Sequence, residues 1–512
     1  MQKTSNFQKN YGLMVRFIVR SVLAIAVLLG AEATMAQRVV LTDFAALCEN
    51  GDWCKAFEAA LRAGDTVVVP AGEYRCSAVR VPSGKTIVGE SEGSVLRQLS
   101  GEMFSVVGTV GMEIALRRDV ADFSDRICLA STDGLAVGDE VVIVGQRNSM
   151  MLEDCGWEWC LGRTYKKCVP FGEFLTISKI GSNTIRTATK TRFPFYRKDN
   201  RHETILPEYK VRRNGTTVRR VDMVRGVVLR DLTIACDSTA RYGVHFRYAE
   251  DCVAENVRIY VSGLAERYNA FAVDWSQRVV CRGCAVETAT EVAERMQPLT
   301  KIGFKAYARY NMYRILAGTE CGFDGCSCDF STHAFNISST SGWIPSVDCF
   351  VRNCSARGDL WAGVIVQQGC IGCRLENNTV VGSAQGVVSG GRNTVIRGNK
   401  VVCTLPLTTN YYYSHIRRGG TSGVGVFEGF AYGSVIEDNT VEGAYTGILI
   451  IDGYERNNIF THGAVEVRNN RVRGCVNGLF VYRNKYNTGE RSFVITDEGN
   501  EYTDMSEAPA AE

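Results

Sequence analysis

The stretch Val395-Ile396-Arg397-Gly398-Asn399-Lys400-Val401 decides the fold, because variants of it return through the second half of the chain. Val435–Val441 is a second copy, and Phe350–Cys354 is a copy with Cys in place of Asn. The equivalent key positions are Leu232, Val257, Cys284, Cys326, Cys354, Asn378, Asn399, Asn439, Asn470 and Asn500. Most steps between them are 21 to 31 residues, and two are 40 and 42. Short strands repeating at this period predict a solenoid in which each unit packs on its neighbours.

The first 36 residues have the features of an export signal. Lys3, Lys9, Arg16 and Arg20 precede an apolar run, Ser21–Gly30, which is too short to span a bilayer. Thr34-Met35-Ala36 resembles a cleavage site for a signal peptidase. We therefore expect a secreted or periplasmic protein with a signal peptide at 1–36, one domain at 37–502 and a flexible tail at 503–512. Residues 128–222 interrupt the repeat and are expected to form partly inserted loops and strands, and no later segment has the length and apolarity of a membrane span.

The charge balance bears on nucleic acid as a partner, and the cysteines bear on disulfides and zinc. The chain has 58 Lys and Arg against 55 Asp and Glu, and the difference disappears without the first 36 residues. This balance gives no electrostatic reason to expect nucleic acid as a partner. Of the 20 Cys, those at key positions are expected in the core, whereas Cys155, Cys160 and Cys168 are candidates for disulfides. The close pairs Cys281/Cys284 and Cys370/Cys373 have no matching second pair, so zinc is not indicated.

The start of the mature chain predicts a cap followed by a first coil. Trp53, Phe57, Ala60 and Leu61 share one face of a helix that Asp52 would cap and Gly64 would end. The segments GDTVVVPAGEY (64–74) and VPSGKTIVG (81–89) follow. In this order, helix and segments resemble the opening coil of the pectate-lyase-like superfamily of secreted proteins, and with the repeat the resemblance covers most of residues 43–500. It implies an all-β, single-stranded, right-handed parallel β-helix, a fold that carries lyases, hydrolases, epimerases and non-catalytic adhesins.

The resemblance also gives a register for the coils. In this fold the key position lies in the turn after the second strand of a coil, so the Asn row is expected to be a structural ladder. The first strands of successive coils are then expected at Tyr242–Arg247, Ala270–Trp275, Gly303–Tyr307, Ala334–Ser338, Gly363–Gln367, Gly386–Ser389, Gly423–Phe427, Gly447–Ile451 and Gly478–Tyr482. Alternation within them points one set of side chains into the core and the other outwards.

The outward set is polar in the first five of these coils and apolar or small in the later ones. The resembling enzymes carry their substrate cleft along this face, so its polar half is the candidate site. We take Lys305, Tyr307, His245, His333 and Asp274 as catalytic candidates, and Arg247, Arg309, Asn336, Gln367 and Asp359 as substrate-binding candidates. Each of these residues alone is also compatible with an ordinary solvated position, and Asp274 could pair with Lys305.

These residue types suit β-elimination on a uronic acid polymer. The reaction needs a base, positive charge that neutralises the carboxylate, and an acid for the leaving oxygen. Lys305, Tyr307 and His245 or His333, with Arg309, supply all three types. We therefore expect a carbohydrate-active enzyme on an acidic polysaccharide, most simply a polysaccharide lyase.

Two alternatives stay open. An inverting hydrolase would use Asp274 with Asp359 or Asp329, since that reaction needs two carboxyl groups roughly 6.5–9.5 Å apart. A protein of the same fold could instead bind glycans without catalysis. The sequence indicates no cofactor: Ca²⁺ would be possible, but the acidic clusters of the calcium-dependent pectate lyases are absent. It gives no indication of the oligomeric state.

Overall fold

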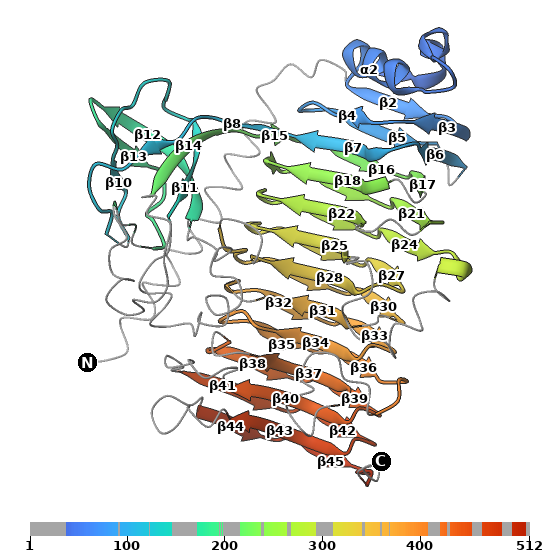
Figure 1. Ribbon diagram of the computed structural model, residues 1–512, viewed down its shortest axis with the longest axis vertical. Helices are drawn as coiled ribbons and strands as arrows, with labels where there is room; N and C mark the ends of the chain where they lie inside the picture. The colour runs from blue at the N-terminus through green and yellow to red at the C-terminus, as the bar shows by residue number, and fades with distance from the viewer. Residues whose placement is uncertain are drawn as a thin grey trace, which may run out of the picture.

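The computed structural model has the expected right-handed parallel β-helix fold, with three long parallel sheets stacked coil on coil (Figure 1). It describes residues 37–507 except for 91–92, 122, 146–171, 194, 196, 198–215, 237–239, 264–267, 293–310, 340–343, 359–360, 368, 408–419, 428–430, 453–462 and 484–493. No helix of these described residues is long and apolar enough to cross a membrane. The signal peptide expected at 1–36 lies outside them.

Three sheets form the walls of the solenoid, and each coil contributes one strand to each sheet. Sheet A is built from β1 (Arg38–Val40), β2 (Thr66–Val69), β5 (Thr86–Gly89), β16 (Val228–Arg230), β20 (Val253–Glu255), β23 (Val280–Arg282), β26 (Gly322–Asp324), β29 (Phe350–Arg352), β32 (Arg374–Glu376), β35 (Val395–Arg397), β38 (Ser434–Glu437), β41 (Ala464–Arg468) and β44 (Val494–Glu498). It holds the second strand of each coil in the expected register.

Sheet B holds the third strand of each coil and follows the ladder turns. It is built from β3 (Gly72–Cys76), β6 (Ser94–Gln98), β17 (Thr233–Cys236), β21 (Arg258–Val261), β24 (Ala285–Thr288), β27 (Ser327–Asp329), β30 (Ser355–Arg357), β33 (Thr379–Val381), β36 (Lys400–Val402), β39 (Thr440–Glu442), β42 (Arg471–Arg473) and β45 (Glu501–Thr503).

Sheet C holds the strands predicted as first strands. It is built from β4 (Val79–Arg80), β7 (Gly101–Val107), β18 (Ala240–Arg247), β22 (Asn269–Asp274), β25 (Asn311–Leu316), β28 (His333–Ser338), β31 (Ala362–Val366), β34 (Gln385–Ser389), β37 (Ser422–Phe427), β40 (Thr446–Asp452) and β43 (Asn477–Arg483). A short parallel pair, β15 (Val224–Arg225) and β19 (Ala249–Glu250), lies between sheets C and A along the chain.

The turn between sheets A and B explains the sequence repeat. The residue before each key position has a left-handed backbone, with φ between 51° and 65°, and it is always Asp, Asn or Gly. These are the residues that tolerate this conformation at least cost. The chain then turns the key side chain inwards. The short motif is therefore a turn signature.

The Asn ladder is confirmed as structure. Asn378, Asn399, Asn439 and Asn470 are at most 1% exposed. The side-chain oxygen of Asn439 accepts the backbone N–H of Asn399 and its side-chain amide, both at 2.9 Å. The Asn439 amide donates to the Ile396 carbonyl and to Asn470, again at 2.9 Å. Each Asn thus satisfies polar groups of the turn, where an unpaired group would be costly.

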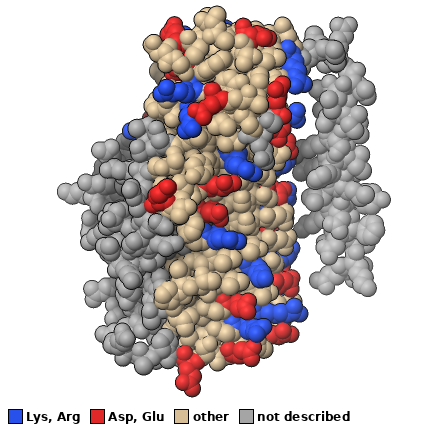
Figure 2. Space-filling model, turned by 90° about the vertical axis from the view of Figure 1, so that its right-hand side faces the viewer, with Lys and Arg blue, Asp and Glu red and all other residues tan. Residues whose placement is uncertain are grey.

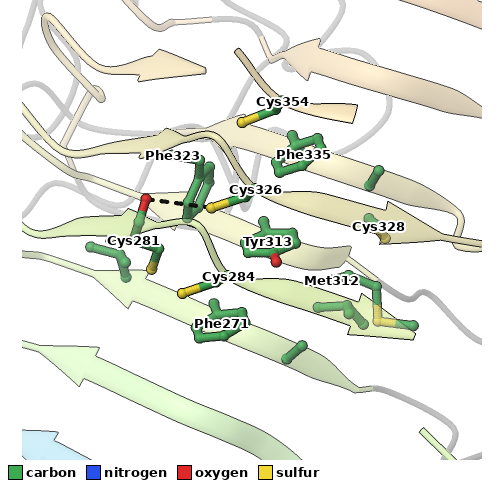
Figure 3. Packing of buried hydrophobic residues seen from close by; sticks show 14 of the residues in the cluster. Phe271, Cys281, Cys284, Met312, Tyr313, Phe323, Cys326, Cys328, Phe335 and Cys354 are labelled. Carbon is green, nitrogen blue, oxygen red and sulfur yellow. Dashed lines mark hydrogen bonds between the residues drawn. The ribbon is translucent and has the colours of Figure 1, made fainter. Parts of the chain in front are cut away.

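Aromatic rings and cysteines fill the core of the central coils (Figure 3). Tyr313 stacks between Phe271 and Phe335, with ring centroids 4.9 and 4.7 Å apart. Cys284, Cys326 and Cys354 are at most 2% exposed, and each thiol donates to the carbonyl two residues before it. The cysteines of the described residues are all free thiols. The disulfide candidates Cys155, Cys160 and Cys168 lie outside the described residues.

One predicted strand is wrong. Gly303–Tyr307 was expected between β22 and β28, but β25 (Asn311–Leu316) pairs directly with both of those strands. The physical reason is the aromatic stack, because Tyr313 occupies the core position that Phe271 and Phe335 hold in the neighbouring coils. Residues 303–307 show a similar alternation of polar and apolar residues. The long step between these two coils leaves room for both segments, so the sequence alone did not distinguish them. Residues 303–307 lie outside the described residues.

A helical cap covers the first coil. A 3-10 helix, η1 (Leu41–Leu47), precedes α2 (Cys54–Ala63), whose C-cap is Gly64 as expected. Asp52 accepts the Cys54 N–H at 2.9 Å, which satisfies one free donor at the helix start. Phe57 is fully buried and packs edge-on against Phe104 in sheet C. The cap thereby shields core and strand edges at this end.

An antiparallel sheet stands beside the solenoid (Figure 1). It is built from β8 (Thr109–Val110), β9 (Ile114–Ala115), β10 (Arg126–Cys128), β11 (Glu140–Val144), β12 (Gly172–Gly181), β13 (Thr184–Thr187) and β14 (Thr217–Asp222). It begins earlier than the interruption expected from residue 128. Val142 and Val221 of this sheet pack against Tyr248 and Trp275 at the turns after sheet C.

Charges alternate along the outer side of sheet A. One column reads Arg230, Glu255, Arg282, Asp324, Arg352, Glu376, Arg397, Glu437, Arg468 and Glu498 through direct strand pairing. Arg352 lies 2.8 Å from Asp324, and Arg468 lies 2.6 Å from the buried Glu437. On the face shown in Figure 2, acidic and basic side chains are likewise interspersed.

Candidate functional site

The candidate site lies on the outward face of sheet C, where β7, β18, β22, β25 and β28 run side by side. The alternation expected from sequence is confirmed here: Val244 and Phe246 are in the core, and His245 faces outwards between them. At the strand starts, however, two consecutive residues turn inwards, as Ala270 and Phe271 do. The residue before such a pair therefore faces outwards, which adds Tyr242, Asn269 and Asn311 to the outer face.

A buried chain of charged groups occupies this face. The two ring nitrogens of His245 lie 3.0 Å from Glu102 Oε1 and 3.1 Å from Asp274 Oδ2. Asp274 in turn accepts two hydrogen bonds from Arg314 Nη2, at 2.8 and 2.6 Å. His245 is 6% exposed and Asp274 7% exposed. We call Glu102, His245, Asp274 and Arg314 the charge network.

The charge network holds His245 in its protonated form. Ionised carboxylates only accept hydrogen bonds, so both contacts of His245 are satisfied only when both ring nitrogens carry hydrogen. Burial lowers the pKa of His245, but its hydrogen bonds to Asp274 and Glu102 outweigh burial and raise the pKa above the ordinary value. His245 is therefore a positive group between two negative ones and is poorly suited to act as a base.

The two carboxyl groups are held ionised. Burial would raise the pKa of Asp274, but Arg314 and His245 bring it below the ordinary value. Burial would also raise the pKa of Glu102, but its hydrogen bond to His245 brings that pKa below the ordinary value. Neither carboxyl group is therefore an obvious proton donor near neutral pH.

Tyr242 lies against both cations of the charge network. Its ring stacks on the His245 ring, with centroids 4.3 Å apart and planes inclined by 14°. The Arg314 guanidinium lies 5.8 Å from the centre of the same ring. Tyr242 is half-buried. A tyrosine placed between two cations is suited to proton transfer.

A group of amides follows one coil further along. Asn311 Oδ1 lies 2.6 Å from His333 Nδ1 and 3.1 Å from the amide nitrogen of Asn336. The His333 ring is 4.7 Å from the ring of Trp361, whose Nε1 donates to Gln385. Among the described residues, the Asn269 and Asn336 side-chain oxygens and Arg314 Nε are buried without a hydrogen-bond partner. Unpaired buried polar atoms are unusual and suit contacts with a polar ligand.

Beyond the amide group the face becomes apolar, as expected from the sequence. Ile365, Val388, Phe427 and Ile451 form a separate buried cluster there. The polar half is thus not a general property of this sheet. A solenoid needs no buried charges on an outer face, and burying them is expensive. The cost points to a role beyond scaffolding.

The structure brings some of the predicted site residues together and separates others. His245 and Asp274 are in the charge network, and His333 and Asn336 are in the amide group. Arg247 is exposed at the end of β18, with its guanidinium 5.2 Å from the Tyr248 ring, and Gln367 is half-buried after β31. Asp329 is in sheet B and takes no part in the network. The remaining candidates, Lys305, Tyr307, Arg309 and Asp359, lie outside the described residues.

Sequence reasoning missed Glu102, Tyr242, Arg314 and Trp361. Tyr242 was inside a predicted strand, but strict alternation assigned it to the core. Arg314 belongs to the strand that was placed at Gly303–Tyr307, and it is the residue that pairs with Asp274 in place of Lys305. Only the alternation of Tyr313 and Ile315 around Arg314 could have revealed it.

Comparisons with known proteins agree with the fold. Pseudomonas phage phi297 tailspike gp61 is 12% identical, with a TM-score of 0.54, over 91% of this chain and 80% of that one. Pseudomonas phage LKA1 tailspike gp49 is 13% identical, with a TM-score of 0.47, over 89% and 72%. The Streptococcus pneumoniae surface adhesin PfbA is 10% identical, with a TM-score of 0.45, over 92% of both chains. No curated protein matches the chain.

The likeness to the phi297 tailspike is one of fold, and it agrees with the right-handed parallel β-helix of the structure. Residues 306–462 also match a family model described as periplasmic copper-binding protein (NosD). This match covers less than a third of the chain, and its periplasmic description agrees with the export predicted from the first 36 residues. The protein is accordingly secreted or periplasmic.

The described residues do not fit a copper site. Copper in proteins is held by thiolates, thioethers and imidazoles. No three His, Cys, Asp or Glu side chains in the described part of the chain converge so that they could hold an ion. His245 is held between two carboxylates, and Cys284, Cys326 and Cys354 donate to backbone carbonyls. We therefore assign no step to a metal.

Proposed function

We propose that the protein is an exported carbohydrate-active enzyme that cleaves an acidic polysaccharide by β-elimination on the polar half of sheet C. The observation that carries this proposal is the position of the Tyr242 ring, which stacks on His245 at 4.3 Å and lies 5.8 Å from the Arg314 guanidinium. This arrangement supplies proton transfer and positive charge at one place. Both are needed to remove the proton next to a uronate carboxylate.

The roles follow from the contacts. Asp274 uses both oxygens on Arg314, which fixes the direction of the guanidinium. Arg314 would neutralise the uronate carboxylate, and Tyr242 would transfer the proton. His245 and Asp274 are positioning residues in this scheme. Lys305 and Tyr307, the candidates from sequence, remain proposed members of the same site.

Attraction for a polyanion needs further cations. With His245 protonated, the charge network has two positive and two negative groups and is neutral as a whole. Arg247 is exposed beside it, and we assign the net attraction to Arg247 with Lys305 and Arg309. The amides of Asn311 and Asn336 and the Trp361 ring would bind the adjoining sugar, by hydrogen bonds and by stacking.

Inverting hydrolysis is less well supported. It needs one carboxyl group that stays protonated until it reaches the leaving oxygen. The pKa of Asp274 is lowered, chiefly by Arg314 against the effect of burial, and Glu102 is shifted in the same direction. The hydrolase would therefore have to find its acid among residues such as Asp359.

The test is to incubate the mature chain with a panel of uronate polymers: polymannuronate, polyguluronate, polygalacturonate and glycosaminoglycans. Elimination creates an unsaturated uronate with a new ultraviolet absorbance. A rise in absorbance with at least one polymer is expected. New reducing ends without the chromophore would favour hydrolysis, and retained binding with neither signal would show a glycan-binding protein. Either of these outcomes would overturn the lyase proposal.

A further inference from the structure

Two cysteines at the N-terminal cap differ from the cysteines of the core. Cys54 is the first residue of α2 and is half-buried, whereas Cys76 ends β3 and is buried. The two residues are neighbours in space, because the Cys54 sulfur lies 3.2 Å from Oγ of Ser77, the residue that follows Cys76. The backbones are held together as well, because Trp53 N donates to Arg75 O at 2.9 Å and Asp52 Oδ1 accepts the N–H of Ser77 at 3.3 Å.

The surroundings of Cys54 suit a reactive sulfur. The Cys54 sulfur accepts the backbone N–H of Ala78 at 3.0 Å and lies 3.2 Å from Ser77 Oγ. A core thiol such as Cys354 instead donates to a carbonyl, here at 3.2 Å, which requires the protonated form. The neighbouring Cys76 thiol is the main cause that lowers the pKa of Cys54. A partly exposed thiol with stabilised thiolate character and a second thiol beside it is the usual arrangement of a redox-active pair.

We propose that Cys54 and Cys76 are an oxidisable pair that forms a disulfide in the exported protein and fastens the helical cap to the first coil. The Cys54 thiolate attacks a disulfide of the oxidant, either a protein dithiol oxidase or a low-molecular-weight disulfide, and releases one thiol. The Cys76 thiol loses its proton, attacks the Cys54 sulfur of the mixed disulfide and releases the second thiol. One disulfide is thereby reduced for each one formed.

A disulfide between Cys54 and Cys76 would stabilise the helical cap on the first coil. The cap is the part of the solenoid that closes the end of the core, and α2 packs on the first coil through Ala56, Phe57, Ala60 and Leu61. If this helix opens, the first strand edges and core become exposed. A bond between α2 and β3 limits that opening, since a cross-link restricts the unfolded chain. The core cysteines are predicted to stay reduced because they are buried and engaged.

The experiment uses the folded mature chain incubated with oxidised glutathione, alkylated after denaturation and mapped by mass spectrometry. A Cys54–Cys76 peptide pair is expected, with Cys284, Cys326 and Cys354 alkylated. In Cys76→Ser, a glutathione adduct should accumulate on Cys54. In Cys54→Ser, Cys76 should stay unmodified. Cys128→Ser, which changes another half-buried cysteine, should leave the Cys54–Cys76 pair intact.

A second readout keeps the proposal testable if Cys76→Ser folds poorly. Limited proteolysis of the cap should be slower in the oxidised wild type than after reduction, and this difference should vanish in Cys54→Ser. Full alkylation of both Cys54 and Cys76 after oxidation would overturn the proposal. Pairing of Cys54 with Cys48 or any other cysteine would do the same.

Discussion

At the scale of single residues, His245 shows how the outer face departs from a simple solenoid wall. An outward His on a parallel sheet would ordinarily be solvated, yet His245 is 6% exposed and bonded on both sides. Its charge is stable only because Glu102 and Asp274 face it from neighbouring strands. The same carboxyl groups make it a poor base. The role of each group in this site is therefore set by its neighbours and not by its residue type alone.

The titration of His245 follows from these contacts. Its folded pKa is raised by Asp274 and Glu102 against the effect of burial, so it should titrate by NMR above the ordinary value of about 6.5. A raised pKa contributes stability that is complete below about pH 6.5 and is lost as the pH rises through the folded pKa. The difference in unfolding free energy between wild type and His245→Gln should therefore shrink from pH 6 to pH 9. A difference that is constant with pH would contradict the protonated network.

Glu173 in β12 gives a second residue-level prediction. Burial raises the pKa of this carboxyl to about 7, although it accepts the Arg192 N–H at 2.8 Å. Its folded pKa is above the unfolded value of about 4.3, so stability is lost as the pH rises through 7. Glu173→Gln should match the wild type near pH 4, where both states are largely protonated, and exceed it by up to ~3 kcal/mol at pH 9. Urea unfolding at both pH values measures this.

The matched control for Glu173 is Glu113→Gln, an exposed acid of the same inserted segment that pairs with Arg219. It should show no gain at pH 9. An equal gain in both variants would mean that general charge reduction, and not burial of Glu173, is responsible.

At the scale of elements, the turn between sheets A and B is the unit that repeats. A left-handed Asp, Asn or Gly is followed by an inward residue, first aliphatic, then Cys and finally Asn. The inward Asn side chains bond to one another and to the backbone from coil to coil. The column of alternating charges on sheet A follows the same stacking, since opposite charges meet in adjacent coils and like charges do not. The Asn ladder and the column of alternating charges both favour one register of the coils.

The Asn ladder predicts a position-dependent loss. Asn439→Ala removes four hydrogen bonds in a fully buried turn and deprives the Asn399 backbone N–H and the Ile396 carbonyl of these partners, whereas Asn470 Oδ1 keeps the backbone N–H of residue 439. We expect a loss of about 3 kcal/mol in unfolding free energy, measured by urea unfolding. Asn500→Ala, in the last turn of the ladder where water has access, should cost about 1 kcal/mol. Equal losses at the two positions would contradict the buried ladder.

The elements also show what sequence can and cannot predict. The turns were predictable because every copy repeats the same local requirement, so the coil register followed from Asn399 and its equivalents. The strand at Asn311–Leu316 was not predictable, because the 42-residue step between key positions contains two segments with alternating polar and apolar residues. The charge network could not be predicted from the sequence for a related reason. Glu102 is 143 residues from His245, and no local pattern connects them.

At the scale of the whole molecule, the solenoid arranges distant residues by stacking. Strands about 4.8 Å apart carry side chains from five coils onto one face. The face changes from charged to amide-rich to apolar along the helix axis, as Arg314, Asn336 and Ile365 illustrate at equivalent positions. An extended polymer along this axis would meet these surfaces in order.

The most direct test of the account measures the rate of ultraviolet absorbance increase on the uronate polymer that the wild type cleaves, comparing Tyr242→Phe with Tyr260→Phe. Tyr260 is a tyrosine on sheet B that is 40% exposed and outside the site. Loss of the phenol at Tyr242 should lower the rate by ~100-fold or more, the usual contribution of general acid–base catalysis, while Tyr260→Phe keeps the wild-type rate. An unchanged rate in folded Tyr242→Phe would contradict the account.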